Sequence, residues 1–138
     1  MRYGIEAITL PVSDVDRTKA FYEKAGWHLD VDTEPGPGIR VVQLTPPGSD
    51  CSVTFGIGFP QSEPGSYRNT YLVVADIEPA HRELAERGIA VSDIFHWSVD
   101  GQTPGPDPKR GDYGSYATFA DPDGNTWLLQ EVPSRAGS

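Results

Sequence analysis

The sequence predicts an α+β protein built from two tandem βαβββ modules, whose strands form a curved mixed sheet. The first observation is an internal repeat: Leu10-Pro11-Val12-Ser13-Asp14-Val15 aligns with Leu72-Val73-Val74-Ala75-Asp76-Ile77 at an offset of 62. Second, each half has a helix-capping side chain and a glycine that ends the helix. Third, three strand candidates follow each helix. We therefore expect a single domain over 1–138, with modules at 1–62 and 63–133 and a flexible tail at 134–138.

Each module begins with a short strand and then an amphipathic helix. Apolar side chains recur at i, i+3 and i+4 spacing, which predicts helices over about 15–25 and 77–87. Short polar residues before each helix can accept hydrogen bonds from its first N–H groups. A glycine after each helix suits the left-handed position that terminates it. The residues in these roles are Ser13 or Asp14, Asp76, Gly26 and Gly88.

Runs of β-branched and aromatic residues separated by Gly and Pro predict the remaining strands. A long segment from about Trp97 to Ser115 interrupts the second module, and loops of this length are either functional or mobile. We keep both interpretations. The predicted strands are 27–33, 40–44 and 52–57 in the first module, and 90–95, 116–120 and 126–131 in the second.

Composition excludes several classes of protein. The net charge of −9 repels phosphate backbones, so no nucleic-acid partner is expected. No run of about eighteen apolar residues is present, so no membrane association is expected. The single cysteine, Cys51, excludes an internal disulfide, and the N-terminal segment lacks a signal-peptide pattern. We therefore expect a cytoplasmic protein.

Two motifs carry a family resemblance. One runs from Ile8-Thr9-Leu10-Pro11-Val12-Ser13-Asp14 into Ala20-Phe21-Tyr22, and the other is Phe119-Ala120-Asp121-Pro122-Asp123-Gly124-Asn125 before the last strand. With the repeat, the sequence resembles the vicinal-oxygen-chelate superfamily of glyoxalase I, extradiol dioxygenases, fosfomycin-resistance enzymes and bleomycin-binding proteins. The resemblance implies a cup formed by curved sheets, and a homodimer.

The resemblance also locates the positions from which family members bind a catalytic metal. Here they hold Ala7, Asn69 and Leu128. Ala and Leu offer no donor atom, and an amide is a poor transition-metal ligand beside imidazole or carboxylate. A catalytic metal needs about three protein ligands. We therefore expect neither a metal nor another cofactor.

Alternation along the strands predicts which side chains face the cup, because residues two apart share a face. Ile8 and Leu10 would pack under the first helix, and Leu72 under the second. Aromatic residues near the long loop could stack on a flat ligand, although core packing explains Phe55 and Tyr116 equally well. The predicted ligand-binding residues are Ala7, Thr9, Phe55, Asn69, Tyr71, Trp97, Tyr113, Tyr116, Thr126, Leu128 and Gln130.

Few other residues are candidates for chemistry. His96, at the end of a strand, is the candidate general acid or base, whereas His81 and His28 have structural or surface roles. Lys109 and Arg110 in the long loop could meet an anionic group, or be solvated charges.

These features lead to one principal hypothesis, a metal-free protein that binds an apolar or aromatic small molecule. In a second hypothesis, a metal-independent enzyme uses His96 or a tyrosine for proton transfer on a carbonyl or phenolic substrate. A metalloenzyme with displaced ligands is the third hypothesis, and a pure interaction module is the fourth.

Overall fold

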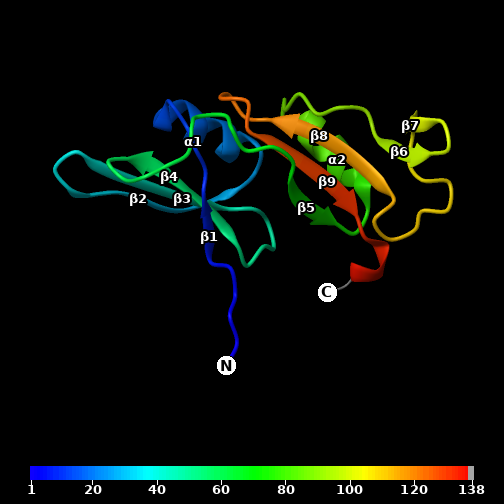
Figure 1. Cartoon of the computed structure of the whole chain (residues 1–138), viewed down its shortest axis with the longest axis horizontal. Coiled ribbons are helices and arrows are strands. Elements are labelled where there is room, and N and C mark those ends of the chain that lie inside the picture. The colour runs from blue at the N-terminus through cyan, green and yellow to red at the C-terminus, as the bar shows by residue number, and fades with distance from the viewer. Residues whose placement is uncertain (137–138) are drawn as a thin grey trace. The chain divides into compact units, whose positions relative to one another are not determined.

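The computed structural model describes residues 1–136, which form two compact units (Figure 1). Unit 1 comprises Met1–Tyr67 with Asp121–Asn125, and unit 2 comprises Arg68–Ala120 with residues 126–136. Each unit has one α-helix and one mixed sheet, of four strands in unit 1 and five in unit 2, which confirms the predicted α+β class. A 3-10 turn, Pro133–Arg135, overlaps the start of the predicted tail 134–138, of which residues 137 and 138 lie outside the described part.

The sheet of unit 1 has the strand order β1-β4-β3-β2. Strand β1 runs parallel to β4, and the other pairs are antiparallel. Helix α1 packs on one face, where Tyr22 is fully buried. The elements are β1 (Ala7–Thr9), α1 (Val15–Lys24), β2 (His28–Gly36), β3 (Ile39–Thr45) and β4 (Ser52–Ile57).

Unit 2 repeats this plan with an added edge strand, in the order β5-β9-β8-β6-β7. Strand β5 runs parallel to β9, and the remaining pairs are antiparallel. Ile77 of α2 packs in the core with Ala117 and Leu129 of the sheet. The elements are β5 (Thr70–Val74), α2 (Ile77–Glu86), β6 (Phe95–Ser98), β7 (Gly101–Pro104), β8 (Ser115–Ala120) and β9 (Thr126–Glu131).

Both helices begin where the sequence predicts. The carboxylate of Asp14 accepts a hydrogen bond from the N–H of Arg17, and that of Asp76 accepts one from Glu78. Gly26 and Gly88 follow the helices with φ of 94° and 83°, a conformation that glycine adopts without steric cost. Among the described residues, no helix has both the length and the apolar character of a membrane span.

The segment after α2 differs from the prediction. Residues 90–94 are not a strand, and β6 begins only at Phe95. The backbone N–H of Ser92 donates to the carbonyl of Thr118, as it would in a strand. In return, the N–H of Thr118 donates to the side-chain hydroxyl of Ser92, whereas in a strand it would donate to a backbone carbonyl. The side chain of Ser92 therefore takes the place of one backbone hydrogen bond between strands at this point. The long segment from 97 also contains the β6–β7 hairpin, not only loop.

Candidate functional site

Unit 2 contains a pocket of about 320 Å³, within the size range of small-molecule sites. The pocket lies over β5, β9, β8 and the β6–β7 hairpin. The described residues that line it are aromatic or neutral, and none of them is Asp, Glu, Lys, Arg or His. The lining residues are Asn69, Tyr71, Phe95, Trp97, Gln102, Tyr116, Thr118 and Leu128.

Strand register explains why these side chains converge. Tyr71 on β5 lies beside Leu128 on β9, which in turn lies beside Thr118 on β8. Phe95 on β6 lies beside Tyr116 on β8. Residues paired across neighbouring strands share a face, so these five side chains project on one side of the sheet.

The other side of the same strands packs on the helix. Leu72, Ala117 and Leu129 each lie next to a lining residue in sequence, and they pack in the core with Ile77 of α2. The pocket is therefore on the face of the sheet that α2 does not cover. Leu128 is 8% exposed and belongs to its floor.

The aromatic rings form the wall at the hairpin end. The rings of Phe95 and Tyr116 lie 5.7 Å apart at 30°, and those of Phe95 and Trp97 lie 6.1 Å apart, edge to face. Trp97 and Tyr71 are 62% and 60% exposed, although both are large apolar side chains. Exposed aromatic surface inside a concavity is typical of a site that stacks on a flat ligand.

Polar groups at the pocket are few and uncharged. Asn69 has φ of 53°, and its N–H donates to the hydroxyl of Thr126 at 2.7 Å. Gln102 faces the pocket from β7, paired with Trp97 across the hairpin. Amide and hydroxyl groups of this kind can orient a ligand through hydrogen bonds without requiring it to carry charge.

Five of the predicted ligand-binding residues line this pocket: Asn69, Tyr71, Trp97, Tyr116 and Leu128. Thr126 supports Asn69 from β9. Gln130 pairs with Tyr116 and Val73, farther along the same face. Tyr113 accepts a hydrogen bond at its carbonyl from the hydroxyl of Tyr116.

Three predicted residues belong to unit 1 and do not line this pocket. Ala7 and Thr9 are on β1, paired with Ser52 and Thr54. Phe55 is fully buried, with its ring 6.4 Å from that of Tyr22 on α1. The side chain of Phe55 is thus in the core of the helix-covered face, which corrects its predicted place in a cup.

His96 does not line the pocket either. Its neighbours Phe95 and Trp97 do, and alternation along β6 places His96 on the opposite face. Its Nδ1 is 2.7 Å from the carbonyl oxygen of Gly105, so this nitrogen carries the proton and donates. The geometry gives His96 a backbone partner and no access to a pocket ligand.

Three lining residues, Phe95, Gln102 and Thr118, are absent from the set predicted from the sequence. Gln102 escapes that prediction because the sequence from 97 onward has the composition of a loop. Phe95 is the last residue of the predicted strand 90–95, and the sequence assigns no face to it. The signal for the hairpin is nevertheless present: Asp100-Gly101 is a favoured hairpin turn, and Gly101 has φ of 90°.

The loop cation Arg110 is committed to the protein itself. Its guanidinium donates to Glu131, Asp76 and Glu78. Glu131 is fully buried and also accepts from the N–H of Ile77. The hydrogen bond from Arg110 lowers the pKa of Glu131, and the bond to Glu131 raises the pKa of Arg110. The charge of Arg110 is therefore already paired within the protein, and we do not assign Arg110 to an anionic ligand.

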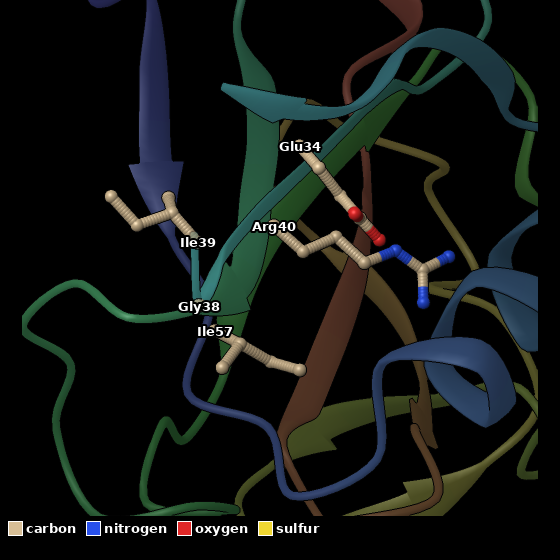
Figure 2. Close-up of a pocket in the computed structure, with 5 residues that line it drawn as sticks. All are labelled: Glu34, Gly38, Ile39, Arg40 and Ile57. Carbon is tan, nitrogen blue, oxygen red and sulfur yellow. The ribbon is translucent and has the colours of Figure 1, made fainter. Parts of the chain in front are cut away.

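Unit 1 has a smaller hollow of about 240 Å³, lined by Glu34, Gly38, Ile39, Arg40 and Ile57. Figure 2 shows the side chains of Glu34 and Arg40, two of the lining residues, extending to the same side. Arg40 is already paired with Asp16 at 2.8 Å and Asp32 at 3.0 Å. Its hydrogen bonds, together with one from Lys19, lower the pKa of Asp32 to about 2. Because the charge of Arg40 is already paired with these carboxylates, Arg40 has little capacity to bind an anionic ligand in this hollow. The aromatic pocket of unit 2 is therefore the better candidate site.

The residues present do not fit a transition metal. Ala7 and Leu128 have no donor atoms, and the amide of Asn69 is a weak one. Within residues 1–136, no group of three or more His, Cys, Asp or Glu side chains is arranged to hold a metal.

Comparisons with known proteins agree with this architecture. Residues 4–129 match the model of the Glyoxalase/Bleomycin resistance protein/Dioxygenase superfamily. A comparison with curated protein sequences gives no match.

Several solved structures are similar over nearly the whole chain. TnmS3, an antibiotic binding protein from Streptomyces sp. CB03234, is 32% identical with a TM-score of 0.71, over 95% of this chain and 97% of that one. A glyoxalase/bleomycin resistance protein from the same organism is 33% identical with a TM-score of 0.68, over 93% and 100%. A superfamily member from Sphaerobacter thermophilus is 25% identical with a TM-score of 0.62, over 94% and 98%.

Proposed function

Because this chain belongs to the glyoxalase/bleomycin resistance protein/dioxygenase superfamily, we propose that it is a small-molecule binding protein whose ligand is uncharged and aromatic. The pocket of unit 2 is the proposed binding site. The proposal includes the absence of a catalytic metal.

The observation that carries the proposal is the lining of this pocket. Four of its eight side chains are aromatic, and the other four are neutral. Burying a charged ligand there would remove its hydration without supplying a counter-ion, which costs free energy. A flat, neutral ring system instead exchanges water for contact with Trp97 and Tyr71, the two most exposed rings of the pocket.

The comparisons support a ligand of the antibiotic class. TnmS3 is described as an antibiotic binding protein, and its 32% identity extends over almost the full length of both chains. Aromatic antibiotics and polyketides are therefore the first compounds to test. Sequestration of such a compound needs no reactive group in the protein, in keeping with the position of His96 on the face opposite the pocket.

A homodimer is part of the same proposal. The family resemblance motivates it, because members of this family commonly pair their subunits. Light scattering of the purified protein distinguishes a dimer of about twice 15.0 kDa from a monomer.

The first test uses Nile red, an uncharged flat dye that brightens when it leaves water. We expect saturable binding to the wild-type protein and at least a roughly tenfold loss of affinity in Trp97→Ala, because Trp97 is a wall of the pocket. Tyr3→Ala, at an exposed aromatic position of unit 1, is the matched control and should bind as the wild type does.

The same protein is then screened by thermal shift against aromatic antibiotics and polyketides. A hit should raise the melting temperature of the wild type and not that of Trp97→Ala. If Nile red affinity is equal in the wild type and Trp97→Ala, the pocket is not the binding site. Elemental mass spectrometry, after incubation with Zn, Ni, Mn and Fe, tests the absence of a metal: about one tightly held metal per chain would restore the metalloenzyme hypothesis.

A further inference from the structure

The β6–β7 hairpin is attached to the sheet of unit 2 over a short length. Phe95 and His96 pair with Tyr116 and Ser115 of β8. The register with β8 ends there, while the two arms of the hairpin continue to pair with each other as far as Ser98 and Gly101. The distal part of the hairpin is thus held by its own ladder at the edge of the sheet, as Figure 1 shows for β6 and β7.

The wall of the pocket depends on this weakly attached hairpin. Phe95, Trp97 and Gln102 all come from it, and they are three of the eight lining residues. Two of its apolar side chains are solvated, since Trp97 is 62% exposed and Val99, at the tip, is 103% exposed. A displacement of the hairpin would therefore move the wall and change the width of the pocket.

Two hydrogen bonds close the base of the hairpin. The N–H of Gly105 donates to the carbonyl of Ile94 at 2.8 Å. The carbonyl of the same glycine accepts from Nδ1 of His96 at 2.7 Å. Gly105 has φ of 89°, and a Cβ there would meet no atom of the described residues within 4 Å. These two hydrogen bonds restrain the backbone of Gly105 at the base of the hairpin.

We propose that His96 is a positioning residue of the ligand pocket. From the face opposite the pocket, its ring ties β6 to Gly105 and so fixes Phe95 and Trp97 as a preformed wall. Loss of this hydrogen bond leaves a hairpin that the ligand must order on binding, which lowers affinity. This inference rests on the proposed function for its effect on binding, but the clasp between His96 and Gly105 is itself measurable in the free protein.

The test compares three substitutions at one position. His96→Ala removes the donor. His96→Asn places an amide nitrogen near the site of Nδ1, whereas His96→Gln places it farther out, near the site of Nε2. His28→Ala, at a histidine whose side chain is 79% exposed in unit 1, is the matched control.

The first readout is made on the free protein, by hydrogen exchange at the amides of residues 97–103 and by iodide quenching of tryptophan fluorescence. Trp27 and Trp127 are 6% and 2% exposed, so iodide reports Trp97. We expect exchange at 97–103 to be about tenfold faster in His96→Ala and His96→Gln, and near the wild-type rate in His96→Asn. Equal exchange in all variants would overturn the clasp.

The second readout is the affinity for Nile red. We expect it to fall roughly five- to tenfold in His96→Ala and His96→Gln, and to be restored in His96→Asn. Rescue by Asn distinguishes positioning from acid–base chemistry, since an amide cannot replace a titrating imidazole. Faster exchange with unchanged affinity would overturn the positioning role. If the wild type fails to bind Nile red while exchange follows the expected order, the proposed function fails and the clasp stands.

Discussion

The hydroxyl of Tyr22 donates a hydrogen bond to the carboxylate of Asp121 at 2.9 Å, across 99 residues of sequence. Tyr22 is fully buried on α1, and Asp121 begins the Asp-Pro-Asp-Gly-Asn turn between β8 and β9. Asn125, which ends this turn, donates from Nδ2 to the same carboxylate and to the carbonyl of Pro11. The turn from the second half of the sequence therefore belongs to the core of unit 1.

Replacing Tyr22 by Phe tests this connection. The substitution keeps the ring and removes one hydrogen bond to a carboxylate that is 5% exposed. Because the bond is to a charged group, we expect the free energy of unfolding to fall by about 1.5–3 kcal/mol, measured by urea denaturation. Tyr3→Phe removes an exposed hydroxyl and should leave stability unchanged. A loss below about 0.5 kcal/mol in Tyr22→Phe would show that the bond contributes little.

Arg110 provides a second test of stability, outside the pocket. The carboxylate of Glu131 is fully buried and accepts hydrogen bonds from Arg110 and from the N–H of Ile77. Arg110→Ala removes the first of these partners and leaves the second. The Arg110 side chain is 35% exposed, so we expect a loss of about 2–3 kcal/mol, less than for a completely buried pair. Lys109→Ala, at the neighbouring loop cation, is the control. If Arg110→Ala is as stable as the control, the ion-pair cluster has no structural role.

Acid should destabilise the protein partly through Asp32. Its hydrogen bonds to Arg40 and Lys19 lower its pKa from 3.8 to about 2 in the folded state. Because the pKa of Asp32 is lower in the folded than in the unfolded state, its ionised carboxylate stabilises the folded protein. This contribution is complete at pH values above the unfolded pKa, and it is lost as pH falls from about 4 toward 2. We expect Asp32→Asn to flatten the pH dependence of the unfolding free energy in this window. Asp50→Asn should retain the wild-type slope, and equal slopes for all three proteins would contradict the assignment.

The repeated helices could be predicted because their signals are local. Asp14 and Asp76 cap the N-termini of the two helices through contacts within a few residues. Gly26 and Gly88 end the helices in the same local way. The displaced strand β6 could not be predicted in this way. Its start depends on the hydroxyl of Ser92, which occupies the ladder position opposite Thr118, and this contact joins positions 26 residues apart.

The candidate site was predictable where alternation alone decides the face. Tyr71 and Leu128 lie on regular strands, and both line the pocket as expected. For Phe55 the sequence left ligand binding and core packing equally good, because the choice between the two faces of β4 requires knowing which face α1 covers. The role predicted for His96 rested on its place at a strand end. The strand instead continues through Trp97, so His96 is an interior position with a fixed face.

Substitutions at Asn69 separate an effect on backbone conformation from an effect on ligand binding. It lines the pocket with φ of 53°, a conformation that glycine and asparagine tolerate and leucine does not. Asn69→Gly keeps this backbone and removes the amide, so we expect unchanged stability within about 0.5 kcal/mol and a roughly three- to tenfold weaker affinity for Nile red. Asn69→Leu should instead lower the free energy of unfolding by about 1 kcal/mol. Wild-type affinity in Asn69→Gly would show that the amide does not contact the ligand and that Asn69 serves the turn into β5 alone.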